Sequence, residues 1–350
     1  MTAGETYAAA GVSIDAGEEA VERIKSAVRS TMRPEVIGDI GGFGGLFRLD
    51  PSRYADPVLV STTDGVGTKA MVATAAGRFD TIGLDLVAMC VDDLVCQGAE
   101  PLFFLDYVSV GRLDPAQVEQ LVSGIAEGCR RAGCALVGGE MAEHPGAMED
   151  GEFDLVGFAV GVVERDAMLP RGVSEGDVVI GLPSPGLRSN GYSLARRLLF
   201  DVAGRSLTDP LHDGPDSPTV AEELLRPSVI YAPAIASLGA EVELHGVAHV
   251  TGGGLPGNLN RILPDDLDAV VDPGSWEPPR VFDELQRIGS VSDAEMRKVF
   301  NMGVGMVVVV PDHEAGRTVE VLGAEGHRAV VMGSIEAGNG EVFFADRSGA

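Results

Sequence analysis

The sequence predicts two α/β or α+β domains, and three observations support this prediction. Segments typical of buried strands alternate with segments of helical spacing in both halves of the chain. The texture changes after Val163, where residues 164–176 are polar and interrupted by Pro and Gly. A chain of 350 residues with 45% hydrophobic content can bury two cores. We therefore expect an N-terminal domain over residues 1–170 and a C-terminal domain over residues 171–350.

The N-terminal half opens with a predicted amphipathic helix and a glycine-rich segment. Residues 17–29 carry acids first and bases later at helical spacing, with Asp15 as the expected cap. Residues 38–47 contain too many glycines for a stable helix. The other expected elements of this half are strands over 58–62, 102–110, 135–138 and 153–163, and helices over 81–98 and 115–133.

The helix expected over 81–98 is apolar except for three aspartates. Asp85 and Asp92 are seven residues apart and so share a face, whereas Asp93 lies about 100° away. A buried carboxylate is costly without a partner. A bound cation is one partner; the alternative is that Asp92 or Asp93 faces solvent or pairs with an arginine.

The C-terminal half repeats the alternation of strands and helices. A loop is expected over 212–218. Strands are predicted over 177–182, 242–249, 305–310 and 327–336, and helices over 193–199, 230–238 and 281–289.

Composition excludes several classes of partner. The formal net charge of -27 argues against nucleic acid and anionic membranes, which both require a basic surface. The apolar runs are too short to span a bilayer, and the amino terminus does not resemble a signal peptide, so we expect a cytoplasmic protein. Four cysteines without metal-binding spacing are expected to be reduced, buried thiols.

The segment after the strand at 58–62 is typical of a nucleotide-phosphate site. Asp64 could hold Mg²⁺, Gly65 and Gly67 let backbone N–H groups approach phosphate oxygens, and Thr68 and Lys69 add a hydroxyl and an ammonium. The chain has only three lysines, which favours a functional role for Lys69. The segment is not a Walker A loop, and a purely structural turn remains an alternative.

Two further glycine-rich turns carry candidate residues. Glu140 follows a Gly-Gly pair, and the turn at 252–254 could expose N–H groups to a second phosphate. For Glu140 and for the turn at 252–254, a purely structural role is the alternative. His144, His245 and His249 lack the spacing of a metalloprotease or a hydrolase triad.

Together the motifs resemble the phosphoribosylformylglycinamidine cyclo-ligase family, also called aminoimidazole ribonucleotide synthetases. The resemblance runs from about Tyr7 to Val310. The matching segments, in family order, are 7–12, 41–47, 61–69, 88–106, 138–140, 189–194, 251–255 and 300–303.

The resemblance implies a step of purine biosynthesis in which ATP phosphorylates an amide oxygen of formylglycinamidine ribonucleotide and an amidine nitrogen then closes the imidazole ring. It also implies Mg²⁺ and a homodimer whose first-domain sheets form a shared barrel. Carried onto this chain, the resemblance implies catalytic roles for Lys69, Asp64, Asp93 and Glu140, with the three acids as metal ligands. It implies nucleotide contacts at Lys25, Gly42, Gly44, Gly45, Gly65, Gly67 and Thr68. It implies substrate contacts at Arg188, Ser189, Asn190, Gly252, Gly253 and Gly254.

The chain departs from the family pattern at three positions. Arg188 stands where His is usual, Asp92 where Asn is common, and Met141 where Thr is usual. An arginine cannot replace a histidine as an acid or base, although it can bind phosphate.

Relatives of the same architecture are the rival interpretations. Thiamine-phosphate kinases lack the glycine-rich segment at 41–47. Selenophosphate synthetases carry an early cysteine that this chain lacks, and the hydrogenase maturation proteins end in a cysteine. An ATP-binding scaffold without catalysis is a further alternative.

Overall fold

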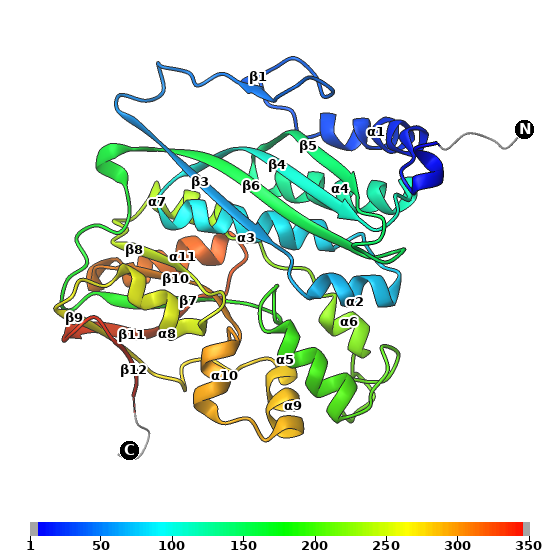
Figure 1. Cartoon of the computed structure of the whole chain (residues 1–350). Coiled ribbons are helices and arrows are strands. Elements are labelled where there is room, and N and C mark those ends of the chain that lie inside the picture. Colours follow the sequence, from blue (N-terminus) through cyan, green and yellow to red (C-terminus); the bar gives the residue numbers. More distant parts are fainter. Residues whose placement is uncertain (1–5, 346–350) are drawn as a thin grey trace, which may run out of the picture.

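The computed structural model describes residues 6–345 and contains two larger sheets joined by one central helix (Figure 1). The four-stranded sheet lies within the first half of the chain, and the six-stranded sheet within the second. This confirms the predicted fold class of two mixed domains. The last strand of the first sheet ends at Glu164, and the first strand of the second begins at Val178.

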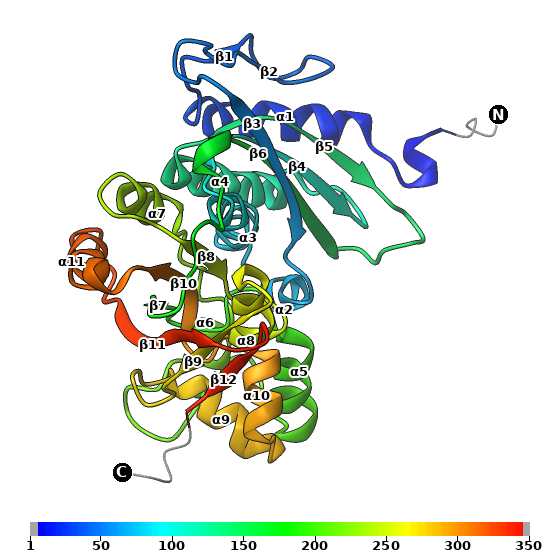
Figure 2. The same cartoon turned by 90° about the vertical axis from the view of Figure 1, so that its left-hand side faces the viewer.

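The first sheet has the order β3-β6-β4-β5, with bounds β3 (Pro57–Gly65), β6 (Phe153–Glu164), β4 (Glu100–Val110) and β5 (Ala135–Glu143). Only the β4–β5 pair is parallel. Helices α3 (Ile82–Cys96) and α4 (Pro115–Ala132) cover one face (Figure 2).

The other face of this sheet has no covering element among residues 6–345 in Figure 2. Strand side chains alternate between the two faces, so β6 is alternately buried and exposed over most of its length. Large apolar side chains lie exposed on the uncovered face: Leu59 (64%), Phe158 (40%), Val156 (39%) and Tyr107 (37%). We call these four residues the open-face patch.

Helix α1 (Ile14–Arg29) packs beside α4 and β5. Its N-cap is Ser13, whose hydroxyl accepts from the Ala16 N–H at 3.2 Å, so the expectation of Asp15 as the cap was wrong. The glycine-rich segment forms the turn between the two-residue strands β1 (Val36–Ile37) and β2 (Leu46–Phe47).

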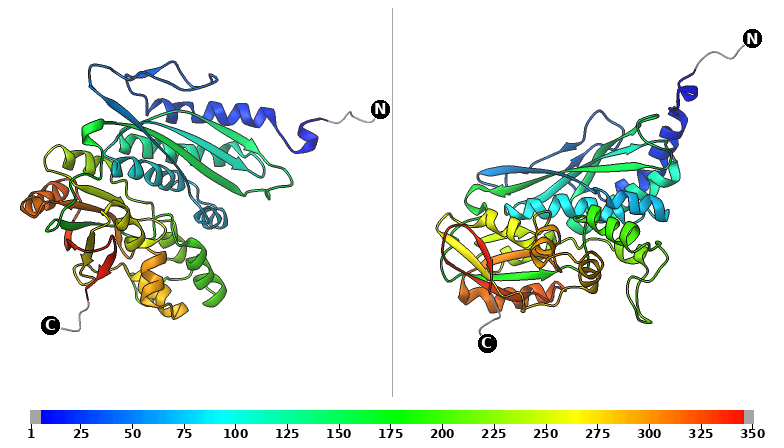
Figure 3. Two further views of the ribbon diagram at one scale, coloured as in Figure 1. Left: turned by 60° about the vertical axis from the view of Figure 1, so that its left-hand side comes forward. Right: turned by 60° about the horizontal axis from the view of Figure 1, so that its bottom comes forward.

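Helix α3 forms the layer between the two domains. It contacts β3 and β6 on one side and β8 (Gly246–His249) and α7 (Ala232–Gly239) on the other, and Figure 3 shows it between the two sheets from two further directions. Its bounds confirm the helix predicted over 81–98. One apolar core cluster includes residues from both domains, so the domains share a packed interface.

The second sheet has the order β12-β9-β11-β7-β10-β8, and only the β12–β9 pair is parallel. Its other strands are β7 (Val178–Pro183), β9 (Leu267–Val271), β10 (Val304–Val310), β11 (Val330–Ala337) and β12 (Val342–Phe344). The remaining α-helices are α2 (Lys69–Ala76), α5 (Tyr192–Arg196), α6 (Val220–Leu224), α8 (Gly254–Leu259), α9 (Arg280–Gly289), α10 (Asp293–Val299) and α11 (Ala315–Ala324). A π-helical turn, η3 (Arg197–Val202), extends α5, and short 3₁₀ turns are η1 (Ala8–Ala10), η2 (Arg165–Ala167), η4 (Asn260–Ile262) and η5 (Asp312–Glu314).

Several element boundaries differ from the predicted ones near the glycine-rich motifs. Strand β3 runs on to Gly65, and α2 begins at Lys69, so the turn between them is only three residues long. Strand β5 continues through Gly138 and Glu140. The strand predicted over 242–249 is confined to β8, four residues long.

The four cysteines are free thiols, and three of them are buried, as expected. Within residues 6–345, no helix has both the length and the apolar character needed to cross a bilayer.

Candidate functional site

A pocket of about 420 Å³ lies at the junction of the two domains. The N-terminal domain contributes residues from β3 and the end of α3, and the C-terminal domain contributes residues from β8, α8 and η4. The residues that line it are Val60, Ser61, Thr62, Asp93, Cys96, Gln97, Pro170, Val247, Ala248, His249, Asn258, Arg261 and Ile262. We call it the junction pocket.

One of the predicted metal ligands, Asp93, lines this pocket, and a second, Asp64, is near enough for the charge of Asp93 to act on it. Asp93 lines it from α3, and Asp64 stands near the end of β3 with its Oδ1 accepting from the Gly65 N–H at 2.7 Å. Burial raises the pKa of Asp64 above its ordinary value, and the negative charge of Asp93 raises it further. A cation between these two carboxylates would remove both costs.

His249, at the end of β8, contacts Asp93, one of the predicted metal ligands, and Arg188 of its own domain. Its Nδ1 lies 2.8 Å from Asp93 Oδ1, and its Nε2 lies 3.0 Å from an Nη2 atom of Arg188. Its side chain is 2% exposed. The spacing of this histidine in the sequence matches neither a metalloprotease motif nor a hydrolase triad.

Arg188 is buried among protein groups, and its predicted role as a substrate contact stays a prediction. Its guanidinium donates to Asp92 Oδ2 at 2.8 Å and to the Val229 carbonyl at 2.8 Å, and it stacks on the Tyr231 ring at 4.9 Å. Asp92 Oδ1 also accepts from the Tyr231 N–H at 2.8 Å. Burial raises the pKa of Asp92, and the guanidinium opposes that rise.

Two departures from the family pattern therefore form one buried ion pair. Asp92 stands where Asn is common and Arg188 where His is usual, and the two side chains are 0% and 1% exposed. Each would be costly to bury alone. The pairing alternative for Asp92, left open by the sequence, is the one that the structure adopts.

Lys69 forms a second buried pair, and its predicted contact with phosphate stays a prediction. Its ammonium is 2.7 Å from Asp85 Oδ2 and donates to the carbonyls of Arg188 (3.0 Å) and Arg226 (2.8 Å). Both side chains of the pair are 0% exposed. Burial lowers the pKa of Lys69, and Asp85 opposes that change. Since all its donors point at protein groups, Lys69 joins the domains.

The predicted glycine and hydroxyl residues of three separate turns do come together. Thr68 Oγ1 lies 3.2 Å from Ser193 Oγ, and a Cβ placed on Gly67 would lie 4.0 Å from the Ser189 carbonyl. A Cβ on Gly252 would lie 4.0 Å from Asn190 Nδ2. The turns at 65–68, 189–190 and 252–254 are thus neighbours.

Within this group, two buried polar atoms have no hydrogen-bond partner in the described part of the chain: Ser189 Oγ and Asn190 Oδ1. Unpaired buried polar atoms are rare in native proteins. They are candidates for contacts with a bound molecule. At position 254, in contrast, the fold itself requires glycine. Its φ is 63°, and a Cβ there would lie 1.8 Å from the Arg297 carbonyl oxygen.

Within one chain Glu140 does not lie with the two aspartates, and the predicted set of three metal ligands stays a prediction. In the register of the sheet, Asp64 lies opposite Gly157, and Gly157 lies opposite Asp106. Glu140 lies opposite Tyr107, the residue that follows Asp106 in β4. Side chains alternate, so Glu140 is on the uncovered face, and three strand spacings separate it from β3, roughly 14 Å. In line with this, no group of three or more His, Cys, Asp or Glu side chains in residues 6–345 could hold a metal ion.

The remaining nucleotide-site candidates lie at the far edge of the same sheet. Lys25, on α1, pairs with Glu22. A Cβ on Gly45 would lie 2.6 Å from Val137 Cγ2 of β5, whereas Gly42 and Gly44 have little around them. In one chain these residues are therefore separated from Asp64 by the width of the sheet.

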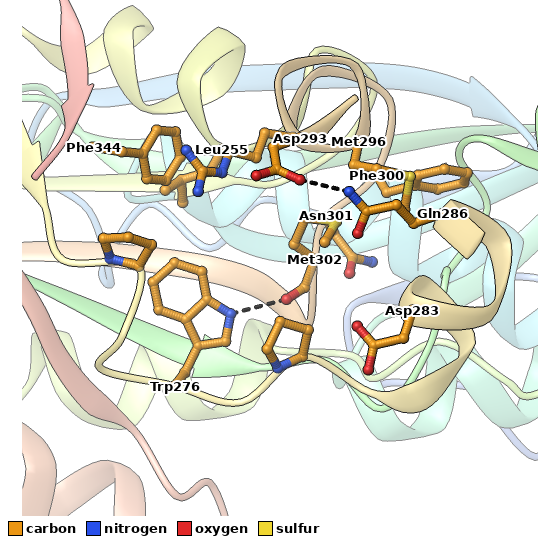
Figure 4. Close-up of a pocket in the computed structure, with 13 residues that line it drawn as sticks. Leu255, Trp276, Asp283, Gln286, Asp293, Met296, Phe300, Asn301, Met302 and Phe344 are labelled. Atoms are coloured by element: carbon orange, nitrogen blue, oxygen red, sulfur yellow. Dashed lines mark hydrogen bonds between the residues drawn. The ribbon is translucent and has the colours of Figure 1, made fainter. Parts of the chain in front are cut away.

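A second, smaller pocket of about 190 Å³ lies within the C-terminal domain (Figure 4). Trp276 donates to the Met302 carbonyl at 2.9 Å at its wall, and Gln286 donates to Asp293 at 2.5 Å. Phe300 and Phe344 add apolar surface. None of the predicted site residues lines it, so the candidate site is the junction pocket.

Comparisons with known proteins identify the family. The model for the AIR synthase related protein, N-terminal domain, matches residues 48–163, and that for the C-terminal domain matches residues 174–346. A phosphoribosylformylglycinamidine cyclo-ligase of Sorangium cellulosum is 53% identical, over 98% of both chains. That of Myxococcus xanthus is 52% identical over 97% of this chain and 98% of its own. That of Trichlorobacter lovleyi is 51% identical over 95% of both. The chain belongs to the phosphoribosylformylglycinamidine cyclo-ligase family.

More distant solved structures share the fold. A thiamine-monophosphate kinase from Stenotrophomonas maltophilia has a TM-score of 0.67 at 19% identity, over 93% of this chain and 95% of its own. Hydrogenase maturation protein HypE, solved in complex with ATP, has a TM-score of 0.64 at 20% identity, over 93% and 90%. These are the architectures named as rivals from the sequence, and at this identity they show the fold alone.

The residues present fit Mg²⁺ at the junction pocket. Mg²⁺ is usually held by one or two carboxylates together with substrate phosphates. Asp64 and Asp93 supply two carboxylates, and burial and mutual repulsion disfavour the ionised form of Asp64 without a cation.

Sequence reasoning missed three residues of the site. His249 and Arg261 line the junction pocket, and Asp85 neutralises Lys69. His249 and Arg261 flank the glycine turn at 252–254 in the sequence, so proximity to that turn was the available signal.

Proposed function

We propose that this protein catalyses the ATP-dependent closure of formylglycinamidine ribonucleotide to 5-aminoimidazole ribonucleotide, with release of ADP and phosphate. The observation that carries this proposal is the 51–53% identity to cyclo-ligases over nearly the whole chain. The thiamine-monophosphate kinase has the same fold at only 19% identity. The cyclo-ligase reaction is therefore favoured over the kinase reaction.

The chemistry suits a site that holds two substrates and excludes water. Phosphorylation of the amide oxygen by ATP converts a poor leaving group into phosphate. The amidine nitrogen of the same molecule then attacks that carbon, and a correctly held intramolecular nucleophile gains the equivalent of a high effective concentration. The protein must then bind both substrates and hold the reacting carbon near the phosphoryl group.

The junction pocket and the turns at 65–68 and 189–190 offer groups for each of these tasks. Asp64 and Asp93 would hold Mg²⁺, which when bound offsets charge on the transferred phosphoryl group. Asn190 Oδ1, a buried acceptor without a partner in the described residues, suits an amidine N–H. Among the residues that line the pocket, Arg261 carries a permanently cationic side chain, and a guanidinium suits a substrate phosphate.

We also propose a homodimer formed through the open-face patch. A second copy seated there would bury Leu59, Tyr107, Val156 and Phe158 and cover Glu140, which points from the same face. The barrel predicted across the dimer would arise from two such sheets.

Turnover tests the function. Purified protein with ATP, Mg²⁺ and formylglycinamidine ribonucleotide should release ADP, phosphate and the aminoimidazole product in equal amounts. Thiamine phosphate in place of the amidine should give no ADP. Binding of ATP without product from either compound would favour the scaffold instead.

A further inference from the structure

Four side chains form a continuous chain of hydrogen bonds across the junction of the domains. It starts at Asp92 on α3, passes through Arg188 and His249 of the C-terminal domain, and returns to α3 at Asp93. The three successive distances are 2.8, 3.0 and 2.8 Å. The side chains of the first three residues are at most 2% exposed, and that of Asp93 is 44% exposed.

The direction of each hydrogen bond follows from Arg188. A guanidinium has only donors and stays protonated in proteins. Burial disfavours its charge, but the neighbouring Asp92 carboxylate and Tyr231 outweigh burial and raise the pKa of Arg188. His249 Nε2 must therefore accept, which leaves the imidazole hydrogen on Nδ1. That Nδ1–H donates to Asp93 Oδ1, so Arg188 sets the tautomer of the histidine.

The hydrogen bond from His249 restricts Asp93. A half-exposed aspartate on a helix would otherwise sample several rotamers. With Oδ1 held by the imidazole, Oδ2 is left without a hydrogen-bond partner among residues 6–345, at the wall of the pocket and near Asp64.

We propose that His249 is a positioning residue, which holds Asp93 in the orientation that binds the cation. The proposal rests on the proposed function for the identity of the cation. Because His249 belongs to the C-terminal domain, it orients Asp93 only while the domains are packed together. The Asp92–Arg188 pair then has a role in the site, which is to fix the imidazole, even though neither side chain is among those that line the junction pocket.

Cation binding without substrates tests the proposal. Mn²⁺ alone is titrated into the wild type and into His249→Phe, which keeps the ring but loses both nitrogens. Loss of a group that orients a metal ligand commonly weakens metal binding about 10- to 100-fold, and we expect a loss in that range. His249→Gln, which offers one donor and one acceptor, should recover most of the affinity.

A matched control is available in the same domain. His245 is also buried, and its Nδ1 lies 2.6 Å from Asp177, away from the pocket. His245→Phe should leave Mn²⁺ affinity unchanged. Equal affinity of wild type and His249→Phe, or equal losses in both Phe variants, would overturn the proposal, as would a wild type that binds no Mn²⁺.

The tautomer gives a second readout that needs neither a metal ion nor a folded His249→Phe variant. In ¹⁵N-labelled, metal-free protein, the resonances of His249, assigned with His249→Gln, should show the proton on Nδ1. A proton on Nε2 would overturn the proposal even if His249→Phe does not fold. Neither measurement uses the amidine substrate, so failure of the proposed function would appear separately, as absent turnover by the wild type.

Discussion

At the scale of single residues, the site is organised by carboxylates whose partners differ. Asp92 and Asp85 are neutralised by Arg188 and Lys69, whereas Asp64 has no ion pair with a Lys or Arg side chain in residues 6–345 and accepts from the Gly65 N–H. The carboxylates with buried cationic partners join the domains. The one that lacks such a partner is the better candidate for a bound cation.

Asp64→Asn should lower turnover while it removes a pH-dependent loss of stability. Turnover with Mg²⁺ should fall at least tenfold, about 1.4 kcal/mol in the barrier. Burial and Asp93 raise the pKa of Asp64 above 3.8, so the folded state holds its proton more tightly than the unfolded state. The resulting stability is present below the unfolded pKa and is lost as pH rises through the folded pKa.

Thermal melts without Mg²⁺ check the second part of this prediction. As pH rises from 3.8 upward, the wild type should lose stability relative to Asp64→Asn. Asp93→Asn serves as the control, because it removes the negative charge that raises the pKa of Asp64 and keeps Asp64 itself. Unchanged kinetics in Asp64→Asn would remove this residue from the site.

Arg188→His alone should be destabilising, although it restores the usual family residue. It leaves Asp92 buried without its cation, and breaking a buried pair costs about 3–5 kcal/mol. The double variant Asp92→Asn/Arg188→His restores both usual residues and should recover much of that loss. Denaturant unfolding of the wild type, both single variants and the double variant gives the coupling energy; additive effects would contradict the pairing.

At the scale of elements, α3 connects the site to both domains. Its Asp85 and Asp92 share one face, as the helical period predicted, and both meet the C-terminal domain, Asp85 at Ser228 and Asp92 at Arg188. Asp93, about 100° around the helix, instead reaches the junction pocket. One helix thereby carries an ion pair between the domains (Asp92–Arg188), an ion pair within the N-terminal domain (Asp85–Lys69) and one candidate ligand.

Lys69→Met tests the role of α2 at this interface. Removal of the ammonium leaves Asp85 with only Ser228 as a hydrogen-bond donor, so unfolding should become easier by about 3–5 kcal/mol. Asp85→Asn added to Lys69→Met removes the stranded charge and should restore part of the loss. Reduced turnover with an unchanged denaturant midpoint would instead support the original prediction of a phosphate contact.

At the scale of the whole molecule, the uncovered sheet face predicts the assembly. Phe158→Glu places a charge in the open-face patch and should convert a dimer to a monomer in sedimentation velocity. Val202→Glu changes an equally apolar, 56% exposed residue of the C-terminal domain and should leave the dimer intact. A monomeric wild type, or a Phe158→Glu variant that remains dimeric, would exclude this interface.

The sequence by itself determined the family, the two-domain fold class and most element positions of the first half. Helical and strand periodicity reflect burial on one side, and this is encoded locally, as the prediction of α3 shows. Glycine-rich turns in family order also located the region of Asp64 and Asp93. The domain boundary near residue 170 and the barrel across the dimer stay predictions.

Only the tertiary structure decided which charges are available to a ligand. Lys69 and Arg188 have the residue types of phosphate contacts, yet each meets a buried aspartate that is distant in the sequence. Glu140 follows a suggestive Gly-Gly pair, yet strand alternation turns it to the opposite face of the sheet from Asp64. The physical reason is that pairing and facing depend on long-range packing, which residue type and local spacing do not encode.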